Sequence, residues 1–279
     1  MKPFLLLATR AEDVPADEEY ALFLRFTGLD EGELVRRRLE AEPLGAIDLD
    51  DYSGIFVGGG PFNASDPPEK KSAVQRRVEA EISGLLDEVI ARDFPFFGAC
   101  YGIGTVGAHQ GAIIDGTYRE PISVVEVHRT DAGAADPLLV DMPDTFAAFV
   151  GHKEAISALP ASATLLVRGD TCPVQMFRVG QNVYATQFHP ECDVEGISTR
   201  IRAYADHGYF AAGELDLTLA AVRRLPVVHT GGILRRSDGA LVGDVSAEFI
   251  GQFKVDYAII GASAIDEEGA LLDFDYREV

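Results

Sequence analysis

Short apolar runs alternate with amphipathic stretches along most of the chain. The runs at residues 4–8, 55–57 and 94–97 are bounded by glycine, proline or charged residues, which predicts buried strands. Residues 18–26 and 72–91 instead carry apolar side chains at helical spacing. This alternation predicts an α/β fold in which helices cover a mainly parallel sheet.

The pattern continues into a second group of apolar runs. Residues 124–127, 164–167, 174–177 and 183–188 are predicted to be further strands, the later ones antiparallel, and residues 194–205 return to a helical pattern. Beyond about residue 222 the chain becomes punctuated by glycine and aspartate. We therefore predict a main domain at residues 1–222 and a short α+β appendage at residues 223–279.

Charge and composition narrow the class of protein. Lys plus Arg number 24 against 45 for Asp plus Glu, which gives a formal net charge of −21. A surface this acidic repels nucleic-acid phosphates and anionic lipid. We therefore expect neither nucleic acid nor membrane as a partner. The apolar N-terminal run is too short for a signal peptide. The three cysteines, Cys100, Cys172 and Cys192, are too few for a disulfide scaffold, which suits a cytoplasmic protein.

One cysteine stands where a catalytic nucleophile is expected. Residues 98–102 have the form G-x-C-x-G, directly after a predicted strand and directly before a predicted helix. Such a tight turn pushes Cys100 out of the sheet edge and places it at the positive end of the helix, where the thiolate is favoured. Taken alone, the motif leaves open a buried cysteine in a glycine-rich turn.

A second motif adds a base and a carboxylate. Residues 187–191 end a predicted strand with the pattern His-x-Glu. Because residues two apart in an extended chain point the same way, Glu191 can hold one nitrogen of His189 while the other faces a nucleophile. A third segment, Gly59 and Gly60 after the strand at 55–57, can direct backbone N–H groups at an oxyanion. The N–H of Tyr101 would be its partner.

Other catalytic classes fit the sequence less well. A cysteine hydrolase of the α/β type places its acid before the histidine, whereas here His189 precedes Glu191. A zinc deaminase needs a P-C-x-x-C motif after its H-x-E, and no cysteine follows Cys192. The remaining histidines show no metal-ligand spacing, so we expect no metal and no cofactor. Of these, His152 is the one candidate for a secondary role in the site.

Together these segments resemble the class I glutamine amidotransferases, particularly the branch similar to GMP synthase, over about residues 1–210. The resemblance is carried by D-D-Y-S-G-I-F-V-G-G-G-P at 50–61, F-G-A-C-Y-G at 97–102, Q-F-H-P-E at 187–191, and weaker matches at 111–114, 118–120 and 151–154. It implies a flavodoxin-like open sheet with helices on both faces. It also implies a glutaminase in which Cys100 forms a γ-glutamyl thioester, His189 moves the protons, and ammonia passes to an acceptor.

The chain departs from this family at one position. The family continues its nucleophile motif as C-x-G-x-Q, and that glutamine helps to hold the substrate; here the position is Gly104. Two alternatives therefore stay open: a γ-glutamyl hydrolase acting on another small amide, and a catalytically silent binding or regulatory module. No S-G-G-x-D-S synthetase loop is present, so the ammonia acceptor is expected to be a small molecule or to lie on a separate synthetase subunit. A homo-oligomer also stays open.

The last part of the chain resembles something different. Residues 228–235, 255–266 and 271–279 are similar to the effector domain of DeoR-family repressors, closest to the glycerol-3-phosphate type. Only a fragment of that domain is recognisable, without the helix-turn-helix. We expect a partial appendage that neither binds DNA nor senses a sugar phosphate.

Overall fold

The structure of the protein is a computed structural model that describes residues 2–204 without a gap. Beyond them it describes Leu219, Val222 and five short strand segments. The chain divides into two compact units, Met1–Arg223 and Arg224–Val279. In the second unit the described strands are β12 (Val228–His229), β13 (Gly232–Leu234), β14 (Leu241–Val242), β15 (Ala264–Ile265) and β16 (Leu271–Leu272). Most of the appendage predicted at residues 223–279 lies outside the described residues.

In the first unit, nine of the described strands form one sheet in the order β2-β1-β3-β4-β11-β10-β9-β6-β7. Its first half is parallel: β2 (Leu34–Arg38), β1 (Phe4–Ala8), β3 (Gly54–Val57), β4 (Phe96–Ala99) and β11 (Val183–Thr186). The second half is antiparallel: β10 (Met176–Val179), β9 (Ala163–Gly169), β6 (Glu120–Arg129) and β7 (Thr145–His152). A separate pair joins β5 (Ile113–Asp115) to β8 (Ala155–Ala158).

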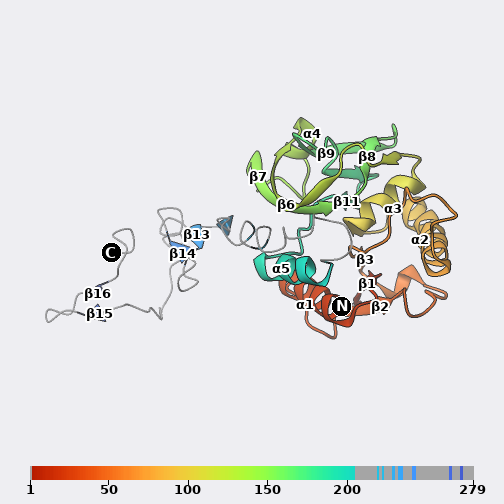
Figure 1. The fold of residues 1–279 in the computed structure, drawn as a ribbon, viewed down its shortest axis with the longest axis horizontal. Helices are drawn as coiled ribbons and strands as arrows, with labels where there is room; N and C mark the ends of the chain where they lie inside the picture. Colours follow the sequence, from red (N-terminus) through yellow and green to blue (C-terminus); the bar gives the residue numbers. More distant parts are fainter. Residues whose placement is uncertain are drawn as a thin grey trace. The chain divides into compact units, whose positions relative to one another are not determined.

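Helices cover both faces of the parallel half, as Figure 1 shows. The helices are α1 (Asp13–Thr27), α2 (Ala73–Arg92), α3 (Tyr101–His109), α4 (Asp131–Ala134) and α5 (Val194–Ala203), with a short 3-10 helix at Leu49–Asp51. Side chains of β1 alternate between the two faces: Leu5 and Leu7 pack with α2 and α3, whereas Leu6 packs with Phe23 of α1. Because side chains on both faces of β1 are buried, every position of the strand is apolar, and its sequence is a continuous apolar run.

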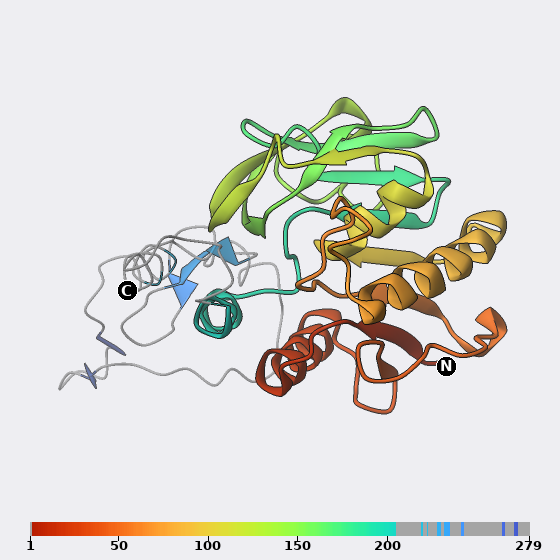
Figure 2. The same cartoon turned by 45° about the vertical axis from the view of Figure 1, so that its right-hand side comes forward.

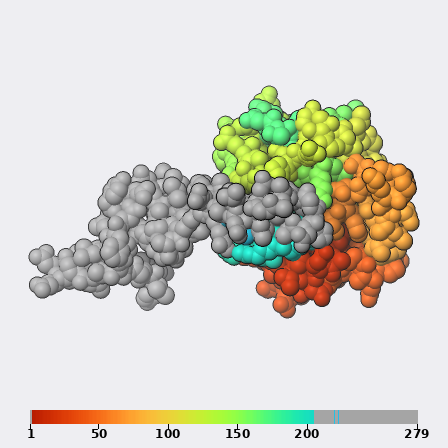
Figure 3. Space-filling model, viewed as in Figure 1, coloured from red at the N-terminus to blue at the C-terminus, as the bar shows by residue number. Residues whose placement is uncertain are grey.

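The helices begin and end at residues suited to those positions. Ser72 caps α2 by accepting a hydrogen bond from the backbone N–H of Gln75, and Asp93 ends it in the left-handed conformation. Asp193 caps α5 in the same way by accepting from the backbone N–H of Gly196. α5 lies beside α1, as the views in Figures 2 and 3 agree. The Asp193 cap fixes where α5 starts, shortly after the end of the predicted Q-F-H-P-E motif.

The α/β fold with a parallel sheet covered by helices, and the antiparallel later strands, are confirmed. Several element predictions differ from the structure: besides the two described next, the strands β5, β7 and β8 and the short helix α4 were not predicted. The first helix begins at Asp13 rather than at residue 18, because Pro15 is tolerated in a first helical turn. The strand β2 was not predicted, since three arginines in its five residues hide any alternation. Among the described residues, no helix is long and apolar enough to cross a bilayer.

Candidate active site

The predicted site residues come from the ends of neighbouring parallel strands. Gly58 to Gly60 follow β3, Cys100 follows β4, and His189 lies three residues after β11. These strands are adjacent in the sheet, with β4 between β3 and β11. Because parallel strands present their carboxyl ends at one edge, segments that are about 130 residues apart along the chain meet there.

Cys100 sits in a strained turn between β4 and α3. Its φ is 51° and its ψ is −93°, a conformation that a residue with a side chain rarely adopts. Its backbone N–H is nevertheless anchored, because it donates to the carbonyl of Thr186 at 2.7 Å. A Cβ on Gly98 would lie 2.8 Å from the backbone of Gly102, so the turn requires glycine there. The thiol is partly exposed at the start of α3.

His189 and Glu191 form the pair that the His-x-Glu pattern predicts. The Nδ1 of His189 lies 2.8 Å from Oε1 of Glu191, and both side chains are almost completely buried. With Nδ1 donating to the carboxylate, the Nε2 side of the ring is left for Cys100, with which the imidazole makes a hydrogen bond. The structure therefore brings together the sulfur, the imidazole and the carboxylate.

The charges in this group stabilise each other. Burial disfavours the imidazolium, but the Glu191 carboxylate and the Cys100 sulfur outweigh it and raise the pKa of His189 to about 9. Burial also disfavours the Glu191 carboxylate, but His189 and Arg200 hold the pKa of Glu191 well below its usual range. At neutral pH the group thus places an imidazolium, held by a carboxylate, beside the Cys100 sulfur. An imidazolium held beside a sulfur by a carboxylate is the arrangement of a cysteine nucleophile with its partner base.

The glycine segment lies against this group. A Cβ on Gly59 would lie 2.9 Å from Cε1 of His189 and 3.6 Å from Cβ of Cys100, so its backbone passes close to the reacting atoms. Gly60 and Tyr101 line the cleft next to Cys100. The Tyr101 ring packs edge-on against Phe62, with the ring centroids 5.8 Å apart.

Three buried charged residues that sequence reasoning missed surround the predicted triad. Arg200 of α5 donates to Oε1 of Glu191 at 3.0 Å, and its Nη2 lies 3.6 Å from Oε1 of Glu19 on α1. Arg10, after β1, donates to the same Glu19 oxygen at 3.0 Å. A Cβ on Gly59 would lie 2.8 Å from Arg10 Nη2, so this guanidinium also reaches the glycine segment.

No pattern along the chain points to this network. Arg10, Glu19 and Arg200 come from three elements that meet only because α1 and α5 pack side by side. The available signal is positional: Glu19 falls on the helix face that also carries Leu22 and Phe23, and Arg200 falls on the face that carries Ile197 and Ile201. Charged residues are rarely buried without a partner.

A cleft opens from Cys100 along α3. It holds about 380 Å³ of empty space, including the part open to solvent. Besides Cys100, its wall includes Asn63, Gly104, His152, Lys153, Glu154 and Gln187. The cleft is thus a polar pocket that reaches the candidate nucleophile.

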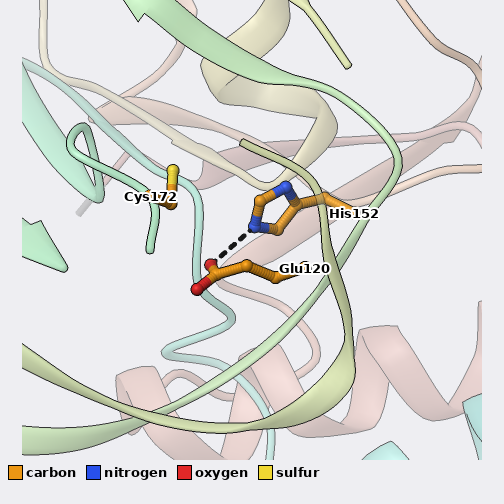
Figure 4. A group of neighbouring side chains, drawn as sticks. All are labelled: Glu120, His152 and Cys172. Atoms are coloured by element: carbon orange, nitrogen blue, oxygen red, sulfur yellow. Dashed lines mark hydrogen bonds and ion pairs between the residues drawn. The ribbon is translucent and has the colours of Figure 1, made fainter. Parts of the chain in front are cut away.

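The structure also contains a second group of the same residue types, drawn in Figure 4. A carboxylate oxygen of Glu120, a ring nitrogen of His152 and Sγ of Cys172 all lie within 4.8 Å of one another. All three residues are buried. The Nε2 of His152 lies 2.9 Å from the Glu120 carboxylate, and its Nδ1 lies 2.8 Å from the backbone oxygen of Glu154. The residue types of this group are also consistent with a Cys-His-Glu triad. The spacing of these three residues in the sequence did not predict that they lie together.

The two groups differ in chemistry. Burial raises the pKa of the Cys172 thiol to about 12, and its sulfur is hydrogen-bonded to the backbone oxygen of Val174. Both nitrogens of His152 face oxygen atoms of other residues, so neither is turned toward a thiol whose proton it could take. Cys172 is completely buried, whereas Cys100 lines the cleft. His152 therefore forms part of the cleft wall, fixed from behind by Glu120.

Residues 33–202 match the model of the family "Glutamine amidotransferase class-I", and the chain belongs to this family. It is 26% identical over 166 residues to one subunit of the glutamine-hydrolyzing GMP synthase from Thermoplasma volcanium. That match covers 58% of this chain and 72% of the relative.

Solved structures agree on the fold. A glutamine amidotransferase from Thermotoga maritima superposes with a TM-score of 0.64 at 20% identity, covering 80% of this chain and 91% of that one. A glutamine amidotransferase from Methylobacillus flagellatus gives a TM-score of 0.58 at 20% identity, with coverages of 80% and 90%. The family and the flavodoxin-like architecture that the motifs imply are thereby confirmed.

The C-terminal part matches a different family. Residues 216–279 match the model "DeoR C terminal sensor domain". The Escherichia coli (strain K12) glycerol-3-phosphate regulon repressor is 44% identical over 62 residues, which are 22% of this chain and 25% of the repressor. The chain therefore spans about a quarter of the length of these repressors, and the resemblance to a DeoR-type fragment is confirmed.

Proposed function

We propose that the protein hydrolyses the side-chain amide of glutamine through Cys100, His189 and Glu191, and delivers the ammonia to an acceptor. The observation that carries this proposal is the placement of Cys100. It is a partly exposed thiol, held at φ 51° at the start of α3 and hydrogen-bonded to an imidazole that Glu191 orients. No other cysteine combines exposure to the cleft with a charged imidazole.

The reaction would proceed in two halves. The Cys100 thiolate attacks the side-chain carbonyl carbon, and the tetrahedral intermediate collapses when His189 gives its proton to the departing nitrogen, which leaves as ammonia. A γ-glutamyl thioester remains on the sulfur. His189, now neutral, takes a proton from water as the water attacks the thioester. Glutamate then leaves and the thiolate is restored.

The glycine segment would stabilise the oxyanion of both tetrahedral intermediates. Gly59 and Gly60 contribute backbone N–H groups from one side, and Tyr101, at the first turn of α3, contributes one from the other. The start of α3 adds the positive end of its dipole. His152 would shape the cleft wall without touching the reacting atoms, since both its nitrogens are engaged elsewhere.

The acceptor would be a small molecule or would lie on a separate synthetase subunit. This follows the family, in which the relative from Thermoplasma volcanium is itself one subunit of a GMP synthase. The resemblance does not make GMP the product here.

The test compares glutamate release from glutamine in wild type, Cys100→Ala and Cys172→Ala. We expect Cys100→Ala to abolish release and Cys172→Ala to retain it, with the γ-glutamyl thioester mapped to Cys100 by mass spectrometry. If Cys172 carries the adduct, the second group is the catalytic one. A wild type that reacts only with another γ-glutamyl amide would make the protein a γ-glutamyl hydrolase. A Cys100 inert to electrophilic glutamine analogues would make it a binding module.

A further inference from the structure

Glu19 is a completely buried carboxylate on α1 that lies between two parts of the candidate site. Its Oε1 accepts a hydrogen bond from Nε of Arg10 at 3.0 Å and lies 3.6 Å from Nη2 of Arg200. Both guanidinium side chains are also almost completely buried. Arg10 reaches the glycine segment, and Arg200 pairs with Glu191 of the predicted triad. Glu19 is therefore in contact with one support of each part.

Arg10 packs against the glycine segment at Gly59. Its Nε donates to Glu19 and its Nη1 donates to the hydroxyl of Tyr204 at 3.0 Å, so two of its nitrogens are anchored. A Cβ on Gly59 would lie 2.8 Å from the third nitrogen, Nη2, and 2.9 Å from Cε1 of His189. The backbone at Gly59 thus packs against the guanidinium and the imidazole together.

Glu19 itself fills the space beside the preceding residue. A Cβ on Gly58 would lie 2.5 Å from Oε2 of Glu19 and 2.8 Å from its Cδ. The backbone N–H of Gly58 donates to the carbonyl of Leu7 at 3.1 Å, and the hydroxyl of Thr9 donates to the carbonyl of Gly59 at 3.4 Å. The chain after β3 is thus fixed to the end of β1 on one side and in contact with the Glu19 carboxylate on another.

Charge holds this network together. The four buried side chains alternate in sign in the order Arg10, Glu19, Arg200 and Glu191. Burial disfavours the Arg10 guanidinium, but Glu19 outweighs the burial and raises the pKa of Arg10 above its usual value. Removal of one member of such a buried network leaves its partners as uncompensated charges. The positions of both arginines therefore depend on Glu19.

We propose that Glu19 is a positioning residue that fixes the glycine segment relative to the predicted triad. It acts through Arg10 on Gly59 and through Arg200 on Glu191, without touching the reacting atoms. This rests on the proposed function, because it takes Gly59 to supply an N–H group to the oxyanion. A displaced N–H group loses oxyanion stabilisation, which is greatest in the transition state. Loss of Glu19 should therefore lower kcat and leave KM nearly unchanged.

The competing role for Glu19 is purely structural: a buried ion pair that joins α1 to α5. A structural role predicts a lower thermal midpoint and an unchanged kcat for each folded molecule. A positioning role predicts a lower kcat in protein that is fully folded. Asp136 is the matched control, because its side chain is completely buried and pairs with Arg178 at 2.8 Å, and it does not line the cleft.

The experiment measures kcat and KM for glutamine hydrolysis by the full chain as wild type, Glu19→Gln and Asp136→Asn. Circular dichroism first establishes that each protein is folded at the assay temperature. Both substitutions keep the size of the side chain and remove its charge. We expect Glu19→Gln to lower kcat by about tenfold to a hundredfold, with KM within about threefold of wild type. Asp136→Asn should lower the thermal midpoint and leave kcat near the wild-type value.

A second variant decides the question if Glu19→Gln does not fold. Arg10→Lys keeps the positive charge and can still pair with Glu19, but its single ammonium group cannot also reach Tyr204 and Gly59. We expect Arg10→Lys to lower kcat by about fivefold or more, again with little change in KM. Where both variants fold, the double variant should lose less than the product of the two effects, because Arg10 and Glu19 act on the same backbone.

Several outcomes overturn the proposal. A wild-type kcat in folded Glu19→Gln or in Arg10→Lys would reduce the network to a structural ion pair. So would a loss of kcat in Asp136→Asn as large as that in Glu19→Gln, and a change confined to KM would contradict a role in the transition state. In each of these cases an active wild type leaves the proposed function standing. A wild type that releases no glutamate would end the proposed function and the role of Glu19 together.

Discussion

Nη1 of Arg200 lies 3.0 Å from Oε1 of Glu191, in a region where both side chains are almost completely buried. The same Nη1 lies 2.9 Å from Nδ1 of His189. Because the Nδ1–H of His189 donates to Glu191, the guanidinium donates to the carboxylate and faces the ring only as a nearby positive charge. Arg200 therefore keeps Glu191 ionised and opposes the charging of His189.

Removal of the Arg200 charge is expected to change the pH dependence of the reaction. Hydrolysis of the thioester needs a neutral His189, and the Arg200 charge lowers the pKa of that imidazole. In Arg200→Gln we expect the acid limb of the kcat profile to move to higher pH, and kcat at pH 7 to fall about tenfold or more. Stopped assays of glutamate release across pH 5–10 measure both effects.

The conservative variant separates this effect from a loss of packing. Arg200→Lys keeps the charge between Glu191 and Glu19 and should restore most of the wild-type pH profile. In both variants the other charged or titratable groups near His189 stay the same. These are Glu191, Cys100 and Arg10, whose guanidinium lies on the other side of Gly59. A uniform loss of kcat in Arg200→Gln, with no movement of the acid limb, would assign Arg200 a structural role alone.

The role of Glu191 can be tested by comparison with Glu120, the carboxylate of the group that contains His152 and Cys172. Glu191→Gln removes the acceptor that fixes Nδ1–H on His189, so the imidazole loses both its tautomer and its counter-charge. We expect kcat to fall at least a hundredfold. Glu120→Gln should instead stay within a few-fold of wild type, while lowering the thermal midpoint, because Glu120 supports the cleft wall. The reverse ranking would favour the group around Cys172.

His189 should also leave a signature in stability. The pKa of its imidazole is raised from about 6.5 in an unfolded chain to about 9 in the folded protein. The charged form therefore contributes stability that is complete below about pH 6.5 and disappears as the pH rises through 9. We expect the difference in unfolding free energy between wild type and His189→Asn to shrink across this interval. Glu191 stays ionised throughout it, because its pKa is lowered. A difference that is constant from pH 6 to 10 would contradict the raised pKa.

The nucleophile turn should tolerate no side chain at Gly98. A Cβ there would lie 2.8–2.9 Å from three backbone atoms of Gly102, which cannot move without displacing α3. Gly98→Ala should cost about 3 kcal/mol of unfolding free energy and most of the activity. The matched control is Gly84→Ala on α2, where a Cβ meets nothing within 4 Å. That change should be neutral or stabilising by about 0.5–1 kcal/mol, as denaturant unfolding can measure.

Some of the fold could be predicted because its signals are local. The strand β1 is an uninterrupted apolar run, and α2 repeats its apolar residues over 20 residues, long enough for the period to be clear. The strand β2 gave no such signal. Two of its arginines form ion pairs with acidic residues outside the strand, Arg36 with Asp17 and Arg38 with Asp13 and Glu40, so that charged side chains cover a strand at the edge of the sheet.

The candidate site divides in the same way. Cys100, His189 and Glu191 could be predicted because each depends on a short stretch: a turn that excludes side chains, and a strand end that directs two residues the same way. Arg200 could not, since it reaches Glu191 only through the packing of α5 on α1. Nor could the approach of the Glu154 carboxylate to Gly104, which is 50 residues away in the chain.

The sequence by itself determined the family and the parallel sheet and singled out Cys100, His189 and Glu191 as a predicted triad, because these follow from local patterns along the chain. Only the tertiary structure decided which cysteine faces the cleft, which charges surround His189, and which side chain lies against Gly104. Those properties depend on burial and on distances between elements remote in sequence, and electrostatic energy in a protein interior is set by just these two quantities.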